Sequence, residues 1–161
     1  MDPRVINALA AASVAGVLFL GFGGVVGTAI GADPVALVKQ REQTMKTMGG
    51  GLGAVAKFVK GEGATVADVR SAAAAITEMV AKDPHTVFPQ GTAIGVSDSE
   101  AKPELWQNWP KAVEYWNGLK PAAARLTEAA NGGDRTQIAQ AMQVMSKACS
   151  NCHEDFRQKK P

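Results

Sequence analysis

Five consecutive residues near the carboxy terminus have the types and the spacing to hold a prosthetic group. They read Cys149-Ser150-Asn151-Cys152-His153. On a helix, two cysteines three positions apart project to neighbouring points of one face, so their thiols can form thioethers with two vinyl groups of one porphyrin. His153 lies one turn beyond Cys149, where a ring nitrogen can reach the iron. The pentapeptide predicts one covalent haem c, anchored by Cys149 and Cys152, with His153 as the proximal iron ligand.

Three other uses of these residues fit less well. A zinc ion needs about four ligands, and His85 is the only histidine or cysteine outside the pentapeptide. A thioredoxin-like dithiol requires a strand followed by a helix, a pattern that this sequence lacks. A disulfide across one helical turn has poor geometry. The sequence therefore favours the haem over a zinc site, a redox dithiol and a disulfide.

Arg41 is the second informative residue, because it interrupts an apolar helical face. The other positions of that face are Val38, Met45, Met48, Leu52, Val55 and Val59. A buried guanidinium needs an acidic partner, unless the long side chain reaches solvent. A protein carboxylate could serve, but the two propionates of a haem suit the planar fork of arginine. We expect Arg41 to contact a propionate.

Met45 follows Arg41 by one helical turn and is the candidate for the iron's sixth ligand, opposite His153. A buried methionine is more often core filler, and Met48 competes for the same role. Met142 and Met145 share a helix with the attachment motif and cannot easily reach the opposite side of the iron. The choice decides function, because His/Met ligation produces a saturated electron carrier, whereas a vacant sixth position lets the iron bind small gases.

Helical spacing recurs four times after residue 32, and no segment shows sustained strand alternation. The first helix should begin at Asp33 and Pro34 and end at Gly61. The second should begin near Thr65 with a partial capping box to Asp68 and end before residue 84. A long loop should follow, over residues 83–103, and a loop of that length in a small domain is usually functional.

The third helical pattern covers residues 105–130, with a break expected near Trp109 because Pro110 follows. The fourth is capped by Asp134, with Gln137 three residues later, and both cysteines lie on its apolar face. A mean repeat of 3.5 residues over four helices indicates an all-α fold, an antiparallel left-handed four-helix bundle with the covalent haem near the C-terminus.

The amino-terminal segment differs from the rest of the chain. Residues 5–32 carry no charge, Arg4 precedes them, and Ala29-Ile30-Gly31-Ala32 supplies small residues at the exit. A cleaved secretory signal peptide has these features, although the run is also long enough to remain as a membrane anchor. We expect residues 1–32 to be a signal peptide, with an uncleaved anchor as the alternative, and residues 33–161 to be the haem domain. Both readings place that domain outside the cytoplasm.

Composition excludes several classes of protein. The chain has 161 residues, 46% of them hydrophobic, and a formal net charge of +2. This net charge is far too small for a nucleic-acid binder that works through a basic surface. Two cysteines are too few for a disulfide-framework protein. An ordinary globular domain with no nucleic-acid partner remains.

Taken together, these residues resemble the class II c-type cytochromes, the cytochrome c′ family. The resemblance covers residues 33–158, and the carboxy-terminal position of the haem motif is specific to this class. Four segments carry it: Arg41-Glu42-Gln43-Thr44-Met45-Lys46, Phe88-Pro89-Gln90-Gly91-Thr92, Ser99-Glu100-Ala101-Lys102-Pro103-Glu104-Leu105-Trp106 and Cys149-Ser150-Asn151-Cys152-His153-Glu154-Asp155-Phe156-Arg157.

The resemblance implies a periplasmic four-helix bundle with His153 as proximal ligand, Arg41 near a propionate, and Ser99 and Glu100 near the haem edge. Low-spin members of the family have methionine at the distal position, with which Met45 aligns. We therefore expect a non-enzymatic carrier that passes single electrons between redox partner proteins through a His/Met-ligated haem. The alternative is a high-spin, five-coordinate cytochrome c′ that binds nitric oxide or carbon monoxide. Homodimers through the first two helices occur in the family.

Overall fold

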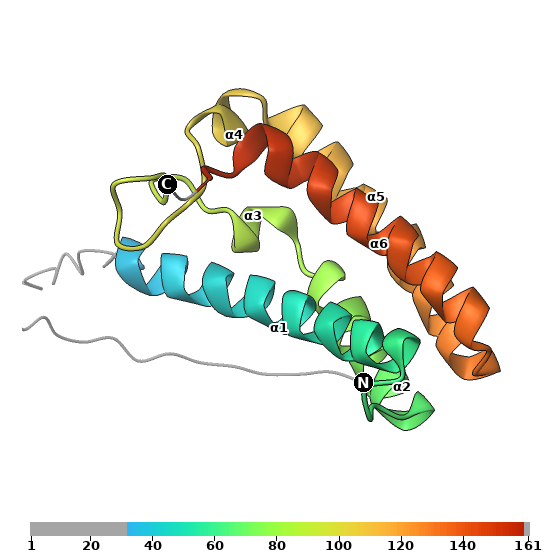
Figure 1. Ribbon diagram of the computed structural model, residues 1–161. Coiled ribbons are helices and arrows are strands. Elements are labelled where there is room, and N and C mark those ends of the chain that lie inside the picture. The colour runs from blue at the N-terminus through green and yellow to red at the C-terminus, as the bar shows by residue number, and fades with distance from the viewer. Residues whose placement is uncertain (1–31, 160–161) are drawn as a thin grey trace, which may run out of the picture. The chain divides into compact units, whose positions relative to one another are not determined.

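The computed structural model describes residues 32–159, and these form an all-α unit. Its long helices are α1 (Pro34–Lys60), α2 (Val66–Val80), α5 (Trp109–Gly132) and α6 (Arg135–Phe156), and its short ones are α3 (Pro84–Val87) and α4 (Glu104–Gln107). Short turns join α1 to α2 and α5 to α6, so the members of each pair run antiparallel (Figure 1). The expected four-helix bundle is confirmed, and its left-handed sense stays a prediction.

The expected helix boundaries follow from side-chain caps. Asp33 accepts a hydrogen bond from the Val35 amide over 3.0 Å at the start of α1, and Asp134 accepts one from the Gln137 amide over 2.8 Å at the start of α6. Each bond satisfies an amide that has no partner within its helix. At the other end of α1, Gly61 adopts a left-handed conformation with φ 77°, which glycine accommodates without steric cost.

Two predicted features of the middle of the chain need comment. The loop over residues 83–103 is not entirely irregular, because Asp83 caps the single turn of α3 by accepting from the His85 amide over 2.9 Å. The expected break near Trp109 is confirmed, since α4 ends at Gln107 and α5 begins at Trp109. Pro110 lies in the first turn of α5, where its missing N–H costs no hydrogen bond.

The core lies between the long helices and is made mostly of alanine and aliphatic side chains. Ile76, Leu126, Ile138 and Met145 each have 0% of their surface exposed. The two helix pairs diverge toward the end of the bundle where α1 begins and α6 ends, and residues 88–103 lie at that end (Figure 1). The backbones of the two helix pairs therefore lie closer together at one end of the bundle than at the other.

The loop at the divergent end is hydrogen-bonded to the last turn of α6. Ala101 and Arg157 form an isolated antiparallel bridge. The Lys102 amide donates to the Phe156 carbonyl over 2.9 Å, and the Gln158 amide donates to the Glu100 carbonyl over 2.8 Å. These bonds hold a long connection in one position.

The signal peptide or membrane anchor expected for residues 1–32 falls outside the described residues except for its last position. Within residues 32–159, no helix has the length and apolar character needed to cross a membrane.

Candidate functional site

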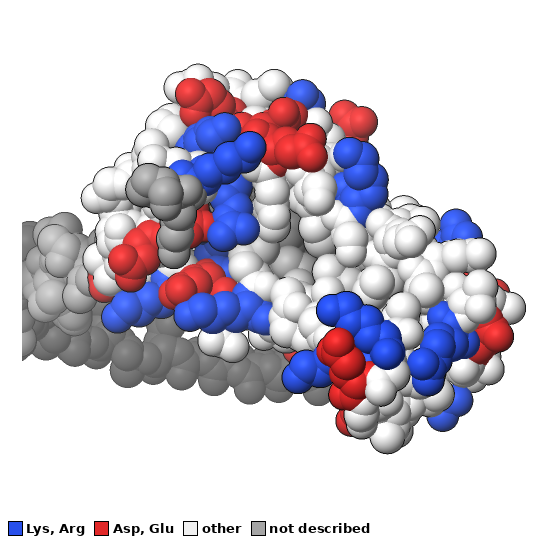
Figure 2. Space-filling model, viewed as in Figure 1, with Lys and Arg blue, Asp and Glu red and all other residues white. Residues whose placement is uncertain are grey.

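A cavity of about 470 Å³ opens at the divergent end of the bundle, within the volume range of cofactor sites. Its walls come from α1, the 88–101 loop, α4, α5 and the end of α6. All seven residues singled out from the sequence line it: Arg41, Met45, Ser99, Glu100, Cys149, Cys152 and His153. Figure 2 shows a recess on this face, with acidic and basic side chains along one edge and uncharged ones along the other.

Cys149 and Cys152 lie on the α6 wall as free, half-buried thiols. Burial raises the pKa of Cys149. Burial, with smaller contributions from the charges of Cys149 and Asp155, raises the pKa of Cys152 to about 11. Both groups are therefore neutral thiols at neutral pH, facing a common apolar space.

His153 follows in the last turn of α6 and is exposed toward the cavity and solvent. Desolvation by the neighbouring protein lowers the pKa of its imidazole, as does the Arg157 guanidinium, while Glu100 raises it. Both leading effects favour the neutral ring, which is the form that binds a metal.

Arg41 reaches the cavity from α1 and is 6% exposed. Its Nη1 donates to Thr92 Oγ1 over 2.6 Å, and its Nη2 donates to the Thr92 carbonyl over 2.7 Å and to Ser99 Oγ over 2.8 Å. Burial lowers the pKa of the guanidinium. Among residues 32–159, no carboxylate forms a salt bridge with it. The protein therefore surrounds this cation with neutral oxygen atoms and with the Phe88 ring, whose centroid lies 5.8 Å from Arg41 Cζ, and pairs it with no carboxylate among these residues.

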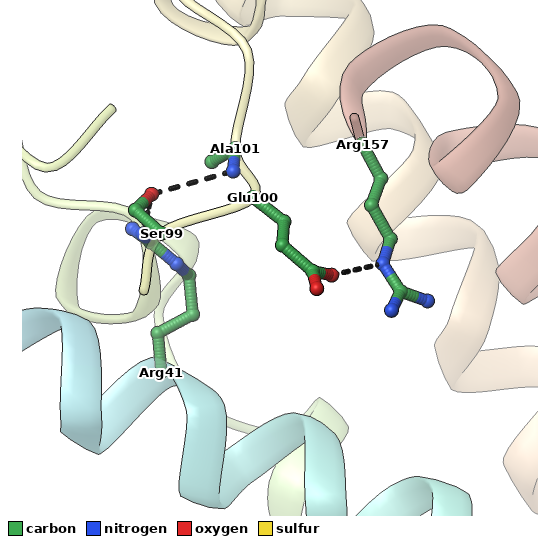
Figure 3. Close-up of polar contacts among 5 residues, drawn as sticks. All are labelled: Arg41, Ser99, Glu100, Ala101 and Arg157. Carbon is green, nitrogen blue, oxygen red and sulfur yellow. Dashed lines mark hydrogen bonds and ion pairs between the residues drawn. The ribbon is translucent and has the colours of Figure 1, made fainter. Parts of the chain in front are cut away.

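Ser99 and Glu100 connect the loop to opposite walls of the cavity (Figure 3). Ser99 accepts a hydrogen bond from Arg41 of α1. Glu100 accepts a hydrogen bond from Arg157 Nε over 2.6 Å at the end of α6, and the two side chains form an ion pair. Both residues thus contact the walls that carry the candidate iron ligands.

The comparisons with known proteins agree with this geometry. The family model for cytochrome C′ matches residues 36–157. A cytochrome c′ from Pararhodospirillum photometricum is 35% identical over 130 residues, which are 79% of this chain and all of that protein. A cytochrome c-556 from Agrobacterium tumefaciens (strain B2A) is 34% identical, over 76% of this chain and 98% of that one.

This chain belongs to the cytochrome c′ family. Among solved structures, a cytochrome c′ described as having an unusual ligand-controlled dimer dissociation is 27% identical, with a TM-score of 0.74. The likeness covers 80% of this chain and 99% of that one.

Cytochrome c′ proteins bind a covalent haem c, and the residues on this cavity fit that group. Two neutral thiols lie three positions apart on one helix face and match the vinyl groups of the haem. The neutral imidazole beside them matches the iron, and the buried cation, which no carboxylate pairs among residues 32–159, matches a propionate. Within residues 32–159, no three histidine, cysteine, aspartate or glutamate side chains form a metal-binding group.

Met45 and Met48 both line the α1 wall of the cavity. Met45 is partly buried, whereas Met48 is 5% exposed. Met145 is fully buried in the core, away from the cavity lining. The relatives named cytochrome c′ do not support the expectation of a low-spin, methionine-ligated branch, and they favour the ligand-binding alternative.

Sequence reasoning missed several cavity residues. Trp116 and Tyr115 of α5 line the cavity, and the spacing of Trp116 on the apolar face of its helix was a usable signal. Arg157 belongs to the carboxy-terminal motif segment, but its partner Glu100 lies 57 positions away. Thr92 carried no signal of its own, because a threonine in a polar loop is ordinary.

Proposed function

We propose that this protein is a periplasmic cytochrome c′ whose haem iron is held by His153 and keeps its other axial position open for nitric oxide or carbon monoxide. When bound, the haem supplies an iron that changes between ferrous and ferric and accepts one further ligand. The observation that carries the proposal is the convergence of Cys149, Cys152, His153 and Arg41 on one cavity. The relatives' names favour the open axial position.

The residues have separate roles in this proposal. Cys149 and Cys152 anchor the haem through thioethers, and His153 supplies the proximal nitrogen. Arg41 binds a propionate, because it is a buried cation whose hydrogen-bond partners are all neutral. Ser99 and Glu100 lie at the haem periphery, where their contacts with α1 and α6 close one side of the cavity.

A second candidate function is electron transfer through a six-coordinate, His/Met-ligated iron. It is favoured by one observation, namely that the partly buried Met45 lines the α1 wall of the same cavity that His153 lines from α6. In this form the iron would have no free position, and the protein would serve only redox partner proteins.

The proposal extends to the cellular location and the partners of the protein. Export to the periplasm is supported by the uncharged residues 5–32, which would be a cleaved signal or a tether to the inner membrane. A homodimer is a further expectation, since a solved relative is described by its ligand-controlled dimer dissociation. Neither a nucleic-acid partner nor bond-making catalysis is expected.

Optical spectra of the purified protein in both redox states test the proposal. We expect a covalently bound haem that resists extraction by acidified acetone, and a high-spin ferrous spectrum that shifts on addition of carbon monoxide. A low-spin ferrous spectrum that carbon monoxide leaves unchanged would instead establish the His/Met carrier. A protein exported without covalent haem would contradict both.

A further inference from the structure

Thr92 is the residue that fixes the direction of the Arg41 guanidinium. It is 0% exposed, and it accepts two of the three hydrogen bonds that Arg41 makes, one on its hydroxyl and one on its carbonyl. Its own hydroxyl proton is committed elsewhere, because Thr92 Oγ1 donates to the Pro89 carbonyl over 2.7 Å. The oxygen lone pairs are therefore the part of this hydroxyl that faces Arg41.

Ser99 is a second hydroxyl that accepts a hydrogen bond from Arg41 and donates its own proton elsewhere. Its hydroxyl donates to the Thr92 carbonyl over 2.7 Å, so its lone pairs accept from Arg41 Nη2 and, over 3.3 Å, from the Ala101 amide. Every hydroxyl proton in this network points away from the guanidinium (Figure 3 shows Arg41, Ser99 and Ala101). The network therefore suits a cation that donates hydrogen bonds, and a group in the same position that could only accept them would meet no donor.

The bound guanidinium keeps both charge and donors for a further partner. A guanidinium has five N–H donors, and Arg41 uses three, two from Nη2 and one from Nη1. Its Nε–H and second Nη1–H have no partner among residues 32–159, and Arg41 lines the cavity. An anionic oxygen in the cavity can accept from these donors without displacing Thr92.

The other cations that line the cavity are already neutralised. Lys46 pairs with Glu42 over 2.8 Å, and Arg157 pairs with Glu100 over 2.6 Å. Arg41 differs from them in being buried and in having only neutral partners. Arg41, which is hydrogen-bonded to Thr92, therefore carries the immobilised positive charge on this cavity wall.

We propose that Thr92 is a positioning residue, which acts through Arg41 to hold a fixed positive charge against an anionic group of the bound haem. This inference rests on the proposed function. A fixed cation near the iron favours the ferrous over the ferric state, because ferrous iron carries one positive charge fewer. Thr92 thus raises the reduction potential although it contacts the haem only through Arg41.

Reduction potentials of four variants of the haem-loaded protein test the proposal. Thr92→Val removes the hydroxyl acceptor at nearly constant volume, and Thr92→Ser keeps it. Arg41→Gln removes the charge and defines the full effect. We expect T92V to lower the potential by at least half of the fall in R41Q, and T92S to stay near wild type. Thr86→Val in α3 is the matched control, because its exposed hydroxyl donates to the Asp83 carbonyl and Thr86 does not line the cavity.

A direct readout of Arg41 separates positioning from a merely structural role. In the ferrous carbon monoxide complex, which is diamagnetic, nitrogen-15 NMR should resolve separate Arg41 Nη signals in wild type and T92S. In T92V, rotation of the guanidinium should merge these signals. A T92V protein with attached haem and wild-type potential would overturn the inference and leave the proposed function intact. Loss of the haem itself in wild type would instead overturn the proposed function. If T92V does not fold, Thr92→Ala carries the same expectations.

Discussion

At the scale of single residues, Met45 decides which of the two candidate functions applies. It lies one helical turn beyond Arg41, on the same face of α1. Its side chain lines the cavity and is only partly buried. A thioether there can either coordinate the iron or serve as an apolar wall, since methionine side chains adapt to irregular spaces. Met48 is more deeply buried, at 5% exposure, and is the natural comparison.

Met45→Leu tests this choice, because leucine keeps the apolar volume and removes the sulfur. For the five-coordinate protein proposed here, we expect high-spin ferric and ferrous spectra that differ little from wild type, and binding of carbon monoxide within about threefold. Met48→Leu should behave in the same way. Conversion of a low-spin wild-type spectrum into a high-spin one by M45L would identify Met45 as a ligand, and conversion by M48L alone would assign that role to Met48.

At the scale of elements, the glycine-rich part of α1 allows α1 and α2 to approach closely. A Cβ added at Gly51 would lie 3.1 Å from the Ile76 side chain and 3.3 Å from the Ala72 carbonyl, whereas one added at Gly53 would meet nothing within 4 Å. A side chain at position 51 would therefore be crowded by α2, whereas one at position 53 would meet no neighbour, although both glycines lie in α1. The absence of a side chain at Gly51 therefore permits the close approach of α1 and α2.

The substitutions Gly51→Ala and Gly53→Ala should change stability in opposite directions. Alanine in place of a helical glycine stabilises by about 0.5–1 kcal/mol, which we expect for G53A. In G51A this gain is outweighed by overpacking against Ile76, which typically costs about 1–3 kcal/mol, so a net loss of about 1 kcal/mol should result. Urea denaturation curves measure both, and equal stabilisation by the two would show that the helices separate freely.

The capping box at the start of α2 makes helix stability depend on pH. Asp68 accepts hydrogen bonds from the Thr65 amide and hydroxyl, both over 2.7 Å, and the backbone bond, followed by the side-chain bond, lowers its pKa. A lowered folded-state pKa means that the stabilisation is present above the unfolded-state value of about 3.9 and is lost as the pH falls through the folded-state value.

Asp68→Ala should therefore be less stable than wild type at pH 7 and equal to it well below pH 3.9. Chemical denaturation of both proteins at a series of pH values follows this difference. A constant difference between D68A and wild type down to pH 2 would exclude the carboxylate as its source.

At the scale of the whole molecule, the bundle is incomplete without its prosthetic group. Leu105, Trp116, Leu119 and Phe156 are core residues that also line the 470 Å³ cavity. Their cavity-facing surfaces lose dispersion contacts when no group fills the space, a cost that reaches several kcal/mol for cavities of this order. We therefore expect a haem bound in this cavity to form part of the hydrophobic core.

The haem-free protein should keep its helices but lose stability. In a variant with Cys149→Ala, Cys152→Ala and His153→Ala, we expect near-native far-ultraviolet circular dichroism and a Tm lower by roughly 10 °C or more, since about 3 kcal/mol corresponds to that shift in a domain of this size. The caps of α1 and α6 lie outside the cavity and should keep those helices formed. An unchanged Tm would mean that the cavity collapses without cost.

The sequence by itself determined the features that depend on local spacing. The caps Asp33, Thr65 and Asp134, the break before Trp109 and the all-α class were predicted correctly, because helix periodicity and capping are properties of neighbouring residues. The pentapeptide around Cys149 predicted the family's haem for the same reason, since its chemistry lies within one helical turn.

Tertiary structure decided the features that join distant segments. The partners of Arg41 within the protein are Thr92 and Ser99, more than 50 positions away, so neutral loop oxygens stand where the alternative had placed a protein carboxylate. The pairing of Glu100 with Arg157 and the cavity itself also arise only when α1, the loop and α6 are brought together. Such contacts leave no periodic trace in the sequence, because nothing local constrains which residues long-range packing makes neighbours.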